Sequence, residues 1–135
     1  MTDIQEFDTS GGPTSVAHRF LGTLATRDFA GLARCLHPDV RMQAVLPIGH
    51  AERHGADVVA ESFRDWFGDA HAVELVGSTV DEVGPRLKLW WRLRVRFSPD
   101  EPGWHLVEQH AFADARDRID AIDLVCSGFN PVEAT

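Results

Sequence analysis

The sequence predicts an α+β domain in which a curved antiparallel sheet packs on three N-terminal helices and forms a cone around a small-molecule pocket. Two observations carry this prediction. Apolar residues recur at helical spacing in three stretches before residue 68, whereas later stretches alternate between apolar and polar residues. Helices that are segregated in sequence from a run of closely connected strands suit a helical layer on one face of an antiparallel sheet.

Three helices are expected before the main run of strands. The first begins near Pro13, and the second has Asp28 as its N-cap and ends before Pro38. The third covers about residues 57–67, and Gly68 ends it. The apolar positions of the three helices are Val16, Ala17, Phe20, Leu21, Leu24, Phe29, Leu32, Ala33, Leu36, Val59, Phe63, Trp66 and Phe67.

The expected strands are recognised by a period of two. One strand runs from about Val40 to Leu46 and is followed by a loop, 47–55, that contains Gly49 and Gly55. Short turns separate the later strands, so we expect them to form an antiparallel meander. These strands lie near 72–83, 86–98, 104–114 and 119–129.

The alternation also predicts which side chains face the helices. In strand 86–98 the inward set is Leu87, Leu89, Trp91, Leu93, Val95 and Phe97. In strand 104–114 it is His105, Val107, Gln109, Ala111 and Ala113. In the last strand it is Asp120, Ile122, Leu124 and Cys126, while Ile119, Ala121, Asp123 and Val125 face outward.

Length and charge limit the functions that the chain can have. We expect a flexible tail over residues 1–13 and a single domain over 14–130. A formal charge of −8 argues against nucleic-acid binding, which requires clustered Lys and Arg. No apolar run is long enough to span a bilayer, and the first dozen residues do not read as a secretory signal. We therefore expect a cytoplasmic protein with no membrane partner.

Neither the cysteines nor the histidines predict a metal site. Cys35 and Cys126 are far apart in sequence and are expected to be free thiols, with a disulfide as the less favoured alternative. His50 and His54 have a spacing that aligns two ligands only on a helix, and they fall in the expected loop. We predict no metal and no cofactor.

Three segments together resemble the nuclear transport factor 2-like superfamily, which includes ketosteroid isomerases and SnoaL-type polyketide cyclases. They are the helix end RDFAGLARCLHPDV, the segment LPIGHAERHG before the third helix, and the closing strands WHLVEQHAFADARDRIDAIDLVCSGF. The resemblance covers about residues 14–130. It implies a deep pocket between the concave sheet and the helices, often in a homodimer formed through the convex face.

The chain departs from the catalytic patterns of this superfamily. The position of the ketosteroid isomerase base falls on Leu46, and the two acidic donors fall on Phe20 and Gln109. The chain has no Tyr, on which the scytalone dehydratase pattern relies, and the apolar inner face of strand 86–98 has no place for the Asp and Arg network of the epoxide hydrolases. Because proton transfer between carbons needs a base and an oxyanion donor, we predict no steroid isomerase activity.

Gln109 is the principal candidate for chemistry because its amide can polarise a ligand carbonyl or orient a water. The alternative is a buried amide satisfied by a neighbour. His105 is a second candidate as an acid or base, against a solvated histidine at the start of a strand. The expected pocket walls are Phe20, Leu46, Val59, Phe63, Trp91, Leu93, Val107, Ile122, Leu124 and Cys126, with Cys126 as a wall residue in preference to a nucleophile.

The convex face mixes aromatic, basic and acidic residues, which is typical of a protein interface. Trp90, His110 and Trp104 lie on it beside Arg92, Arg94 and Arg96. The alternative is a solvated face with cross-strand ion pairs such as Arg94 with Glu108. The tryptophans favour a homodimer.

Three candidate functions follow, one catalytic and two non-catalytic. The first is a SnoaL-like enzyme of cyclase, isomerase or dehydratase type that acts on a hydrophobic polyketide-like or terpenoid-like substrate. The second is a carrier that binds such a molecule without a reaction. The third is a dimeric interaction module whose cavity is filled by its own side chains.

Overall fold

A computed structural model describes residues 12–100 and 102–132 of the chain. Residues 1–11 of the expected tail over 1–13 lie outside the described residues. Pro13, the last residue of that expected tail, is the first residue of a helix. In these two described ranges, no helix is long and apolar enough to cross a membrane.

Three helices form close to the expected positions, but the second ends at Arg34, and Leu36, expected as an apolar position of that helix, is the first residue of a strand that was expected to begin near Val40. The helices are α1 (Pro13–Ala25), α2 (Phe29–Arg34) and α3 (Ala56–Phe67). The carboxylate of Asp28 accepts a hydrogen bond from the backbone N–H of Gly31 at 2.9 Å, which confirms the expected N-cap of α2. Each helix buries its apolar side against the sheet or a neighbouring helix, so the three together form one covering layer.

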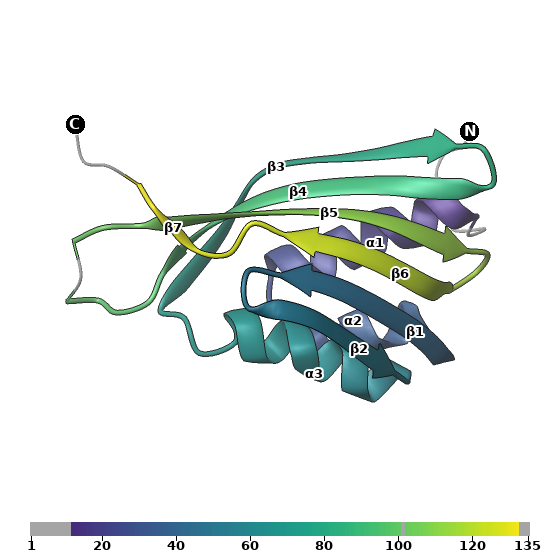
Figure 1. Cartoon of the computed structure of the whole chain (residues 1–135), viewed down its shortest axis with the longest axis horizontal. Helices are drawn as coiled ribbons and strands as arrows, with labels where there is room; N and C mark the ends of the chain where they lie inside the picture. Colours follow the sequence, from purple (N-terminus) through teal and green to yellow (C-terminus); the bar gives the residue numbers. More distant parts are fainter. Residues whose placement is uncertain (1–11, 101, 133–135) are drawn as a thin grey trace, which may run out of the picture.

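The strands form one curved sheet with the order β2-β1-β6-β5-β4-β3, and a short β7 pairs with β5. The predicted meander from β3 to β6 is antiparallel throughout, but β1 pairs with β6 in parallel, so the sheet is mixed. Figure 1 shows the helices on one side of this sheet. The strands are β1 (Leu36–Leu46), β2 (Gly49–His54), β3 (Ala72–Val83), β4 (Arg86–Arg96), β5 (His105–Ala115), β6 (Ile119–Cys126) and β7 (Asn130–Pro131).

The predicted alternation holds in the centre of the sheet. Trp91, Leu93 and Gln109 are all completely buried and face the helical layer. In β6 the expectation is right for Ile122 and Leu124 and wrong for Ile119 and Ala121, which are both buried. The register between β5 and β6 shifts just before this end of β6, and such a bulge moves the following side chains to the other face.

The segment 49–54 is a strand, which corrects the expected loop. A two-residue turn at Pro47 and Ile48 brings it back along β1, where Leu46 pairs with Gly49. Most of its side chains are exposed, so β2 has no apolar period for a sequence pattern to reveal. It is stabilised by backbone pairing with β1 rather than by burial.

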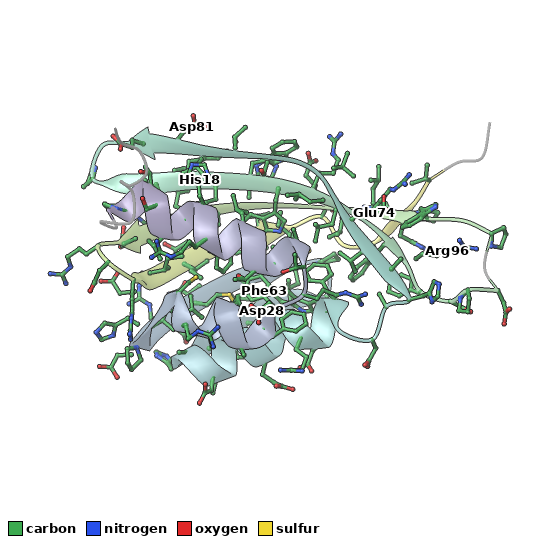
Figure 2. The ribbon with its side chains drawn as sticks, turned by 180° about the vertical axis from the view of Figure 1, so that it is seen from behind. His18, Asp28, Phe63, Glu74, Asp81 and Arg96 are labelled. Carbon is green, nitrogen blue, oxygen red and sulfur yellow. The ribbon has the colours of Figure 1, made fainter. Side chains whose placement is uncertain are left out.

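Large aromatic side chains fill the inside of the cone. The ring of Phe20 on α1 contacts Phe63 on α3 with centroids 5.6 Å apart and Trp91 on β4 with centroids 5.8 Å apart. Figure 2 views the molecule from the helix side and shows Phe63 near the middle of this layer. The three rings join two helices to the sheet and leave the narrow part of the cone packed.

Arg27 fixes the end of α3. Its Nη1 lies 3.1 Å, 3.5 Å and 2.7 Å from the carbonyl oxygens of Phe67, Gly68 and Ala70. The Phe67 carbonyl also accepts from the backbone N–H of Ala70 at 3.4 Å, and Arg27 adds a charged donor at this helix end, where carbonyls lack partners within the helix. Arg27 also has a positive φ of 56°, a conformation that costs most residues about 1–2 kcal/mol. The turn between α1 and α2 therefore accepts backbone strain and holds the C-terminus of α3 in place.

Ion pairs cover part of the convex face, but not in the expected pairing. Arg94 binds Glu74 on β3, and its guanidinium lies 4.3 Å from the ring centre of Trp104. Glu108 instead accepts from the indole N–H of Trp90 at 2.7 Å and from Arg92 at 3.0 Å. The hydrogen bond from Trp90, with that from Arg92, lowers the pKa of Glu108. The register explains the difference, because Arg92 and not Arg94 lies opposite Glu108.

The contacts of Arg27 predict the effect of replacing it with Asn, which tolerates positive φ but is too short to reach α3. We expect Arg27→Asn to lower the free energy of unfolding by roughly 1–3 kcal/mol in a urea titration, since hydrogen bonds from a charged donor contribute that much. Arg53 is exposed and bonds only to the carbonyl of the adjacent Glu52, so Arg53→Asn is the matched control. Equal stability of the two variants would contradict the role given to Arg27.

Candidate functional site

A cleft of about 330 Å³ opens at one end of the cone. The turn between β1 and β2, the C-terminal end of β6 and the C-terminal end of α3 meet there, as the left side of Figure 1 shows. Arg27 fixes the helical wall through the carbonyls at the end of α3. The lining residues are Leu46, Pro47, Ile48, Trp66, Phe67, Gln109, Cys126, Gly128 and Phe129.

Gln109 supplies the buried polar group of this cleft. It lies on β5 directly opposite Trp91 on β4 and Cys126 on β6, in the middle of the sheet. The Gln109 side chain is 0% exposed, and its Oε1 accepts a hydrogen bond from the indole N–H of Trp91 at 2.7 Å. The central position of β5 thus brings an amide from the core to the wall of the cleft.

The hydrogen bond from Trp91 determines the orientation of the amide. An indole nitrogen can only donate, so the atom that faces it must be the amide oxygen. The amide nitrogen Nε2 is buried and has no hydrogen-bond partner among the described residues. A buried donor without a partner costs about 1–3 kcal/mol. Because Gln109 lines the cleft, the wall of the cleft includes an amide N–H that lacks an acceptor.

The described lining of the cleft includes no Asp, Glu, His, Lys or Arg. Besides the Gln109 amide, its reactive group is the thiol of Cys126, whose Sγ accepts from the backbone N–H of Gly128 at 3.4 Å. Across the described ranges no cluster of His, Cys, Asp or Glu is arranged to hold a metal ion. The arrangement can bind an uncharged apolar molecule and donate a hydrogen bond to one of its oxygens.

The structure divides the expected wall residues into two groups. Leu46, Gln109 and Cys126 lie on the cleft. The others lie in the core and do not line the cleft, because aromatic rings such as those of Phe20, Phe63 and Trp91 fill the space between helices and sheet. This core group comprises Phe20, Val59, Phe63, Trp91, Leu93, Val107, Ile122 and Leu124. Contact of either group with a ligand stays a prediction.

The structure does not bring His105 and Gln109 to one point. They are four residues apart on β5, which corresponds to about 13 Å along a strand. The His105 ring packs against Phe97 with centroids 5.1 Å apart, and it does not line the cleft. Its Nδ1 is buried and lacks a partner in the described part of the chain. A joint action of these two residues on one reacting atom does not fit this spacing, and a separate role for His105 stays a prediction.

Several residues of the cleft were not assigned to it from the sequence. Trp66 and Phe67 were recognised only as apolar positions of a helix. They lie one turn after Phe63, which was an expected wall residue, and on the same side of the helix. The Phe129 ring contacts those of Phe67 and Phe97 with centroids 5.9 Å and 5.1 Å away. The available signal was Gly128 inside the expected strand 119–129, because a glycine there indicates a bend; the structure ends β6 at Cys126 and gives Gly128 a positive φ.

A second hollow, of about 460 Å³, lies at the opposite end of β6, beside the turn between β5 and β6. Its lining includes Arg116, Asp117, Arg118 and Asp120, and the guanidinium of Arg116 lies 3.8 Å from the carboxylate of Asp120. The lining of this hollow is largely charged, whereas the lining of the Gln109 cleft is largely apolar and includes a residue with a buried, unpartnered donor. The Gln109 cleft is therefore the candidate site.

Comparison with known proteins supports the fold and the family. A family model for SnoaL-like domains matches residues 17–122. No curated protein sequence matches the chain. A nuclear transport factor 2-like protein from Anabaena variabilis superposes with a TM-score of 0.70 at 15% identity, covering 94% of this chain and 96% of that one.

Two further solved structures have names that refer to activities. A candidate polyketide cyclase from Xanthomonas campestris has a TM-score of 0.66 at 17% identity and covers 83% of this chain and 87% of its own. A protein from Catenulispora acidiphila with a ketosteroid isomerase-like fold, in complex with trimethylamine, has a TM-score of 0.66 at 11% identity, with coverages of 81% and 82%. At these identities the likeness establishes the shared fold alone.

Substitution of Gly128 tests how closely this residue packs against Pro47 in the wall of the cleft. Its φ is +80°, and a Cβ added there would lie 2.7 Å from Cγ of Pro47. We expect Gly128→Ala to lower the free energy of unfolding by more than the roughly 1–2 kcal/mol that left-handed backbone alone costs. Chemical denaturation measures this difference.

Two other glycines separate the causes. Gly84 has a φ of +59° but open space around it, so Gly84→Ala should show the backbone cost alone. Gly103 has open space and no unusual φ, so Gly103→Ala should be neutral. If Gly128→Ala were no worse than Gly84→Ala, the contact with Pro47 would be of no consequence.

Proposed function

Because the chain belongs to the family of SnoaL-like domains, we propose that it is a small-molecule enzyme of the cyclase, isomerase or dehydratase type. Its substrate is a neutral, hydrophobic, polyketide-like or terpenoid-like compound that binds in the cleft at Gln109. The observation that carries this proposal is the buried Nε2 of Gln109, which has no partner among the described residues.

The surroundings of Gln109 define the ligand. The apolar walls favour a hydrophobic molecule, and the amide N–H favours an oxygen acceptor such as a carbonyl. A charged ligand would lose its hydration without gaining a counter-charge, since the described lining has no ionisable partner besides a thiol. The ligand is therefore an uncharged carbonyl compound.

The same surroundings define the chemistry. A hydrogen bond from Gln109 to a carbonyl oxygen stabilises negative charge that develops on that oxygen during carbon–carbon bond formation or proton loss. The base position of the ketosteroid isomerases is Leu46 in the wall of this cleft, so no carboxylate there removes a proton. Catalysis then rests on holding a reactive substrate in a folded shape and on excluding water.

A second candidate is a carrier that binds the same class of compound without a reaction. The absence of Asp, Glu and His from the described lining favours it specifically, because general acid–base catalysis depends on such groups. Native mass spectrometry of the purified protein followed by solvent extraction would identify a bound compound. Conversion of that compound by fresh protein supports the enzyme, and its recovery unchanged supports the carrier.

A matched pair of probes tests the role of Gln109. 1-Tetralone carries a carbonyl that tetralin lacks, and both are neutral and apolar. We expect the wild type to bind 1-tetralone roughly 5- to 100-fold more tightly, because it satisfies a donor that is otherwise buried unpaired. Quenching of the intrinsic tryptophan fluorescence, to which Trp66 in the wall contributes, measures both affinities.

Gln109→Leu should abolish this preference while leaving tetralin binding nearly unchanged. Ser62→Ala removes another buried polar side chain, on α3 and outside the lining of the cleft, and should keep the preference. Circular dichroism confirms that each variant folds. Equal preference in wild type and Gln109→Leu would remove the basis of the proposed function.

We further propose that two copies of the chain associate through the convex face of the sheet. Val45, Val125, His110 and Trp90 are register neighbours across β1, β6, β5 and β4 and form an outward band. Val125 is 53% exposed and Val45 51%. An apolar, aromatic band beside the Arg92 and Glu108 pair has the composition of an interface core with a polar rim.

Charge introduced into this band should separate the copies. We expect Val125→Glu to convert a dimer into a folded monomer, as measured by size-exclusion chromatography with light scattering, because it buries an unpaired carboxylate at the interface. Val83→Glu, at an equally exposed valine near the end of β3, is the control and should stay dimeric. A wild-type monomer at micromolar concentration would rule out the dimer.

A further inference from the structure

Resting on the function proposed above, we propose that this protein captures α,β-unsaturated carbonyl compounds covalently. Cys126 Sγ adds to the β-carbon of the compound while Gln109 Nε2 donates a hydrogen bond to its carbonyl oxygen. The proposal assigns Cys126 a role beyond that of a wall residue and makes the bound class of compound specific.

The two groups are close neighbours on one wall. Gln109 and Cys126 are directly paired residues on β5 and β6, and both line the cleft. Directly opposite residues on one face of an antiparallel pair have Cβ atoms about 4.5–5.5 Å apart. The carbonyl oxygen and the β-carbon of an enone are separated by two carbon atoms, which suits a hydrogen-bond donor and a sulfur at this spacing.

The thiol is also placed for reaction. The cysteines are both free, and Cys126 is partly exposed on the cleft wall. The backbone N–H of Gly128, in the turn after β6, donates a hydrogen bond to Sγ of Cys126 and orients it. A second observation supports a site here: Gln109, paired with Cys126 across the strands and lining the same cleft, is completely buried, and its amide nitrogen has no hydrogen-bond partner among the described residues.

The addition is balanced without any further reactant. The thiol gives its proton to water, and the sulfur electron pair forms the new bond to the β-carbon. The electrons of the carbon–carbon double bond move to give an enolate, whose oxygen accepts the hydrogen bond from Gln109. Water then returns a proton to the α-carbon. The net change is addition of S–H across the double bond, with no oxidation or reduction.

The other cysteine provides an internal control. Cys35 lies at the C-terminal end of α2 and is 5% exposed. Burial, only partly offset by Arg19, raises the pKa of the Cys35 thiol, so less of the reactive thiolate is present. One chain therefore contains a thiol beside an amide donor and a buried thiol without one.

The test uses 2-cyclohexen-1-one on the full-length protein, with intact-mass and peptide mass spectrometry. We expect one adduct, on Cys126 and not on Cys35. Cyclohexanone, which lacks the double bond, should give none. Cys126→Ser should remove the adduct.

Gln109→Leu separates the proposed mechanism from ordinary thiol reactivity. It should slow addition of the enone by roughly tenfold or more, which is the effect of losing a donor to a developing oxyanion. Its rate with methyl methanethiolsulfonate, which has no carbonyl, should stay within about twofold of wild type. An equal enone rate in the two proteins, or equal labelling of Cys35, would overturn the capture mechanism.

The outcome is distinguishable from failure of the proposed function. If 1-tetralone binding depends on Gln109 but enone labelling does not, covalent capture is wrong and reversible ligand binding stands. If neither depends on Gln109, both proposals fail. Slower enone addition in Gln109→Leu with unchanged methanethiolsulfonate labelling supports capture.

Discussion

The hydrogen bond from Trp91 to Gln109 links the core of this protein to its candidate site. Trp91 is completely buried and in contact with Phe20, so its indole N–H needs a partner inside the protein. Gln109 supplies it through Oε1 at 2.7 Å, which leaves its amide nitrogen without a partner among the described residues. Gln109 also lines the cleft, so the orientation of this amide follows from the packing beneath the cleft wall.

The sequence could predict the parts of the fold that depend on period. Alternation along β4 and β5 is enough to place Trp91, Leu93 and Gln109 inside, since a side chain on a strand has only two faces to choose between. The helix cap at Asp28 and the meander from β3 to β6 are equally local. For the same reason the candidate donor was identifiable before its surroundings were known.

The position of the cleft could not be predicted in this way, because it depends on how far the core fills the cone. The Phe20 ring contacts the rings of Phe63 and Trp91. These rings fill space between the helices and the sheet that the alternation of residues alone does not show to be filled. The wall beyond them depends on pairings between distant segments, such as Gly128 with Pro47 and Arg27 with the end of α3. Likewise the sequence of β2 has no alternation of apolar and polar residues, and the strand forms because its backbone pairs with β1.

The described lining of the cleft has Leu46 and Gln109 but no carboxylate or imidazole, and this bears on the kind of substrate that the proposed function requires. A carboxylate base lowers the barrier for a substrate that is stable in water, whereas an amide donor in an apolar cleft contributes a smaller stabilisation. The compound must then bring its own reactivity, and conjugation to a carbonyl is a form of reactivity that a single donor increases. Cys126 lies opposite that donor, so the same geometry that suits a reactive carbonyl also sets a nucleophile beside it.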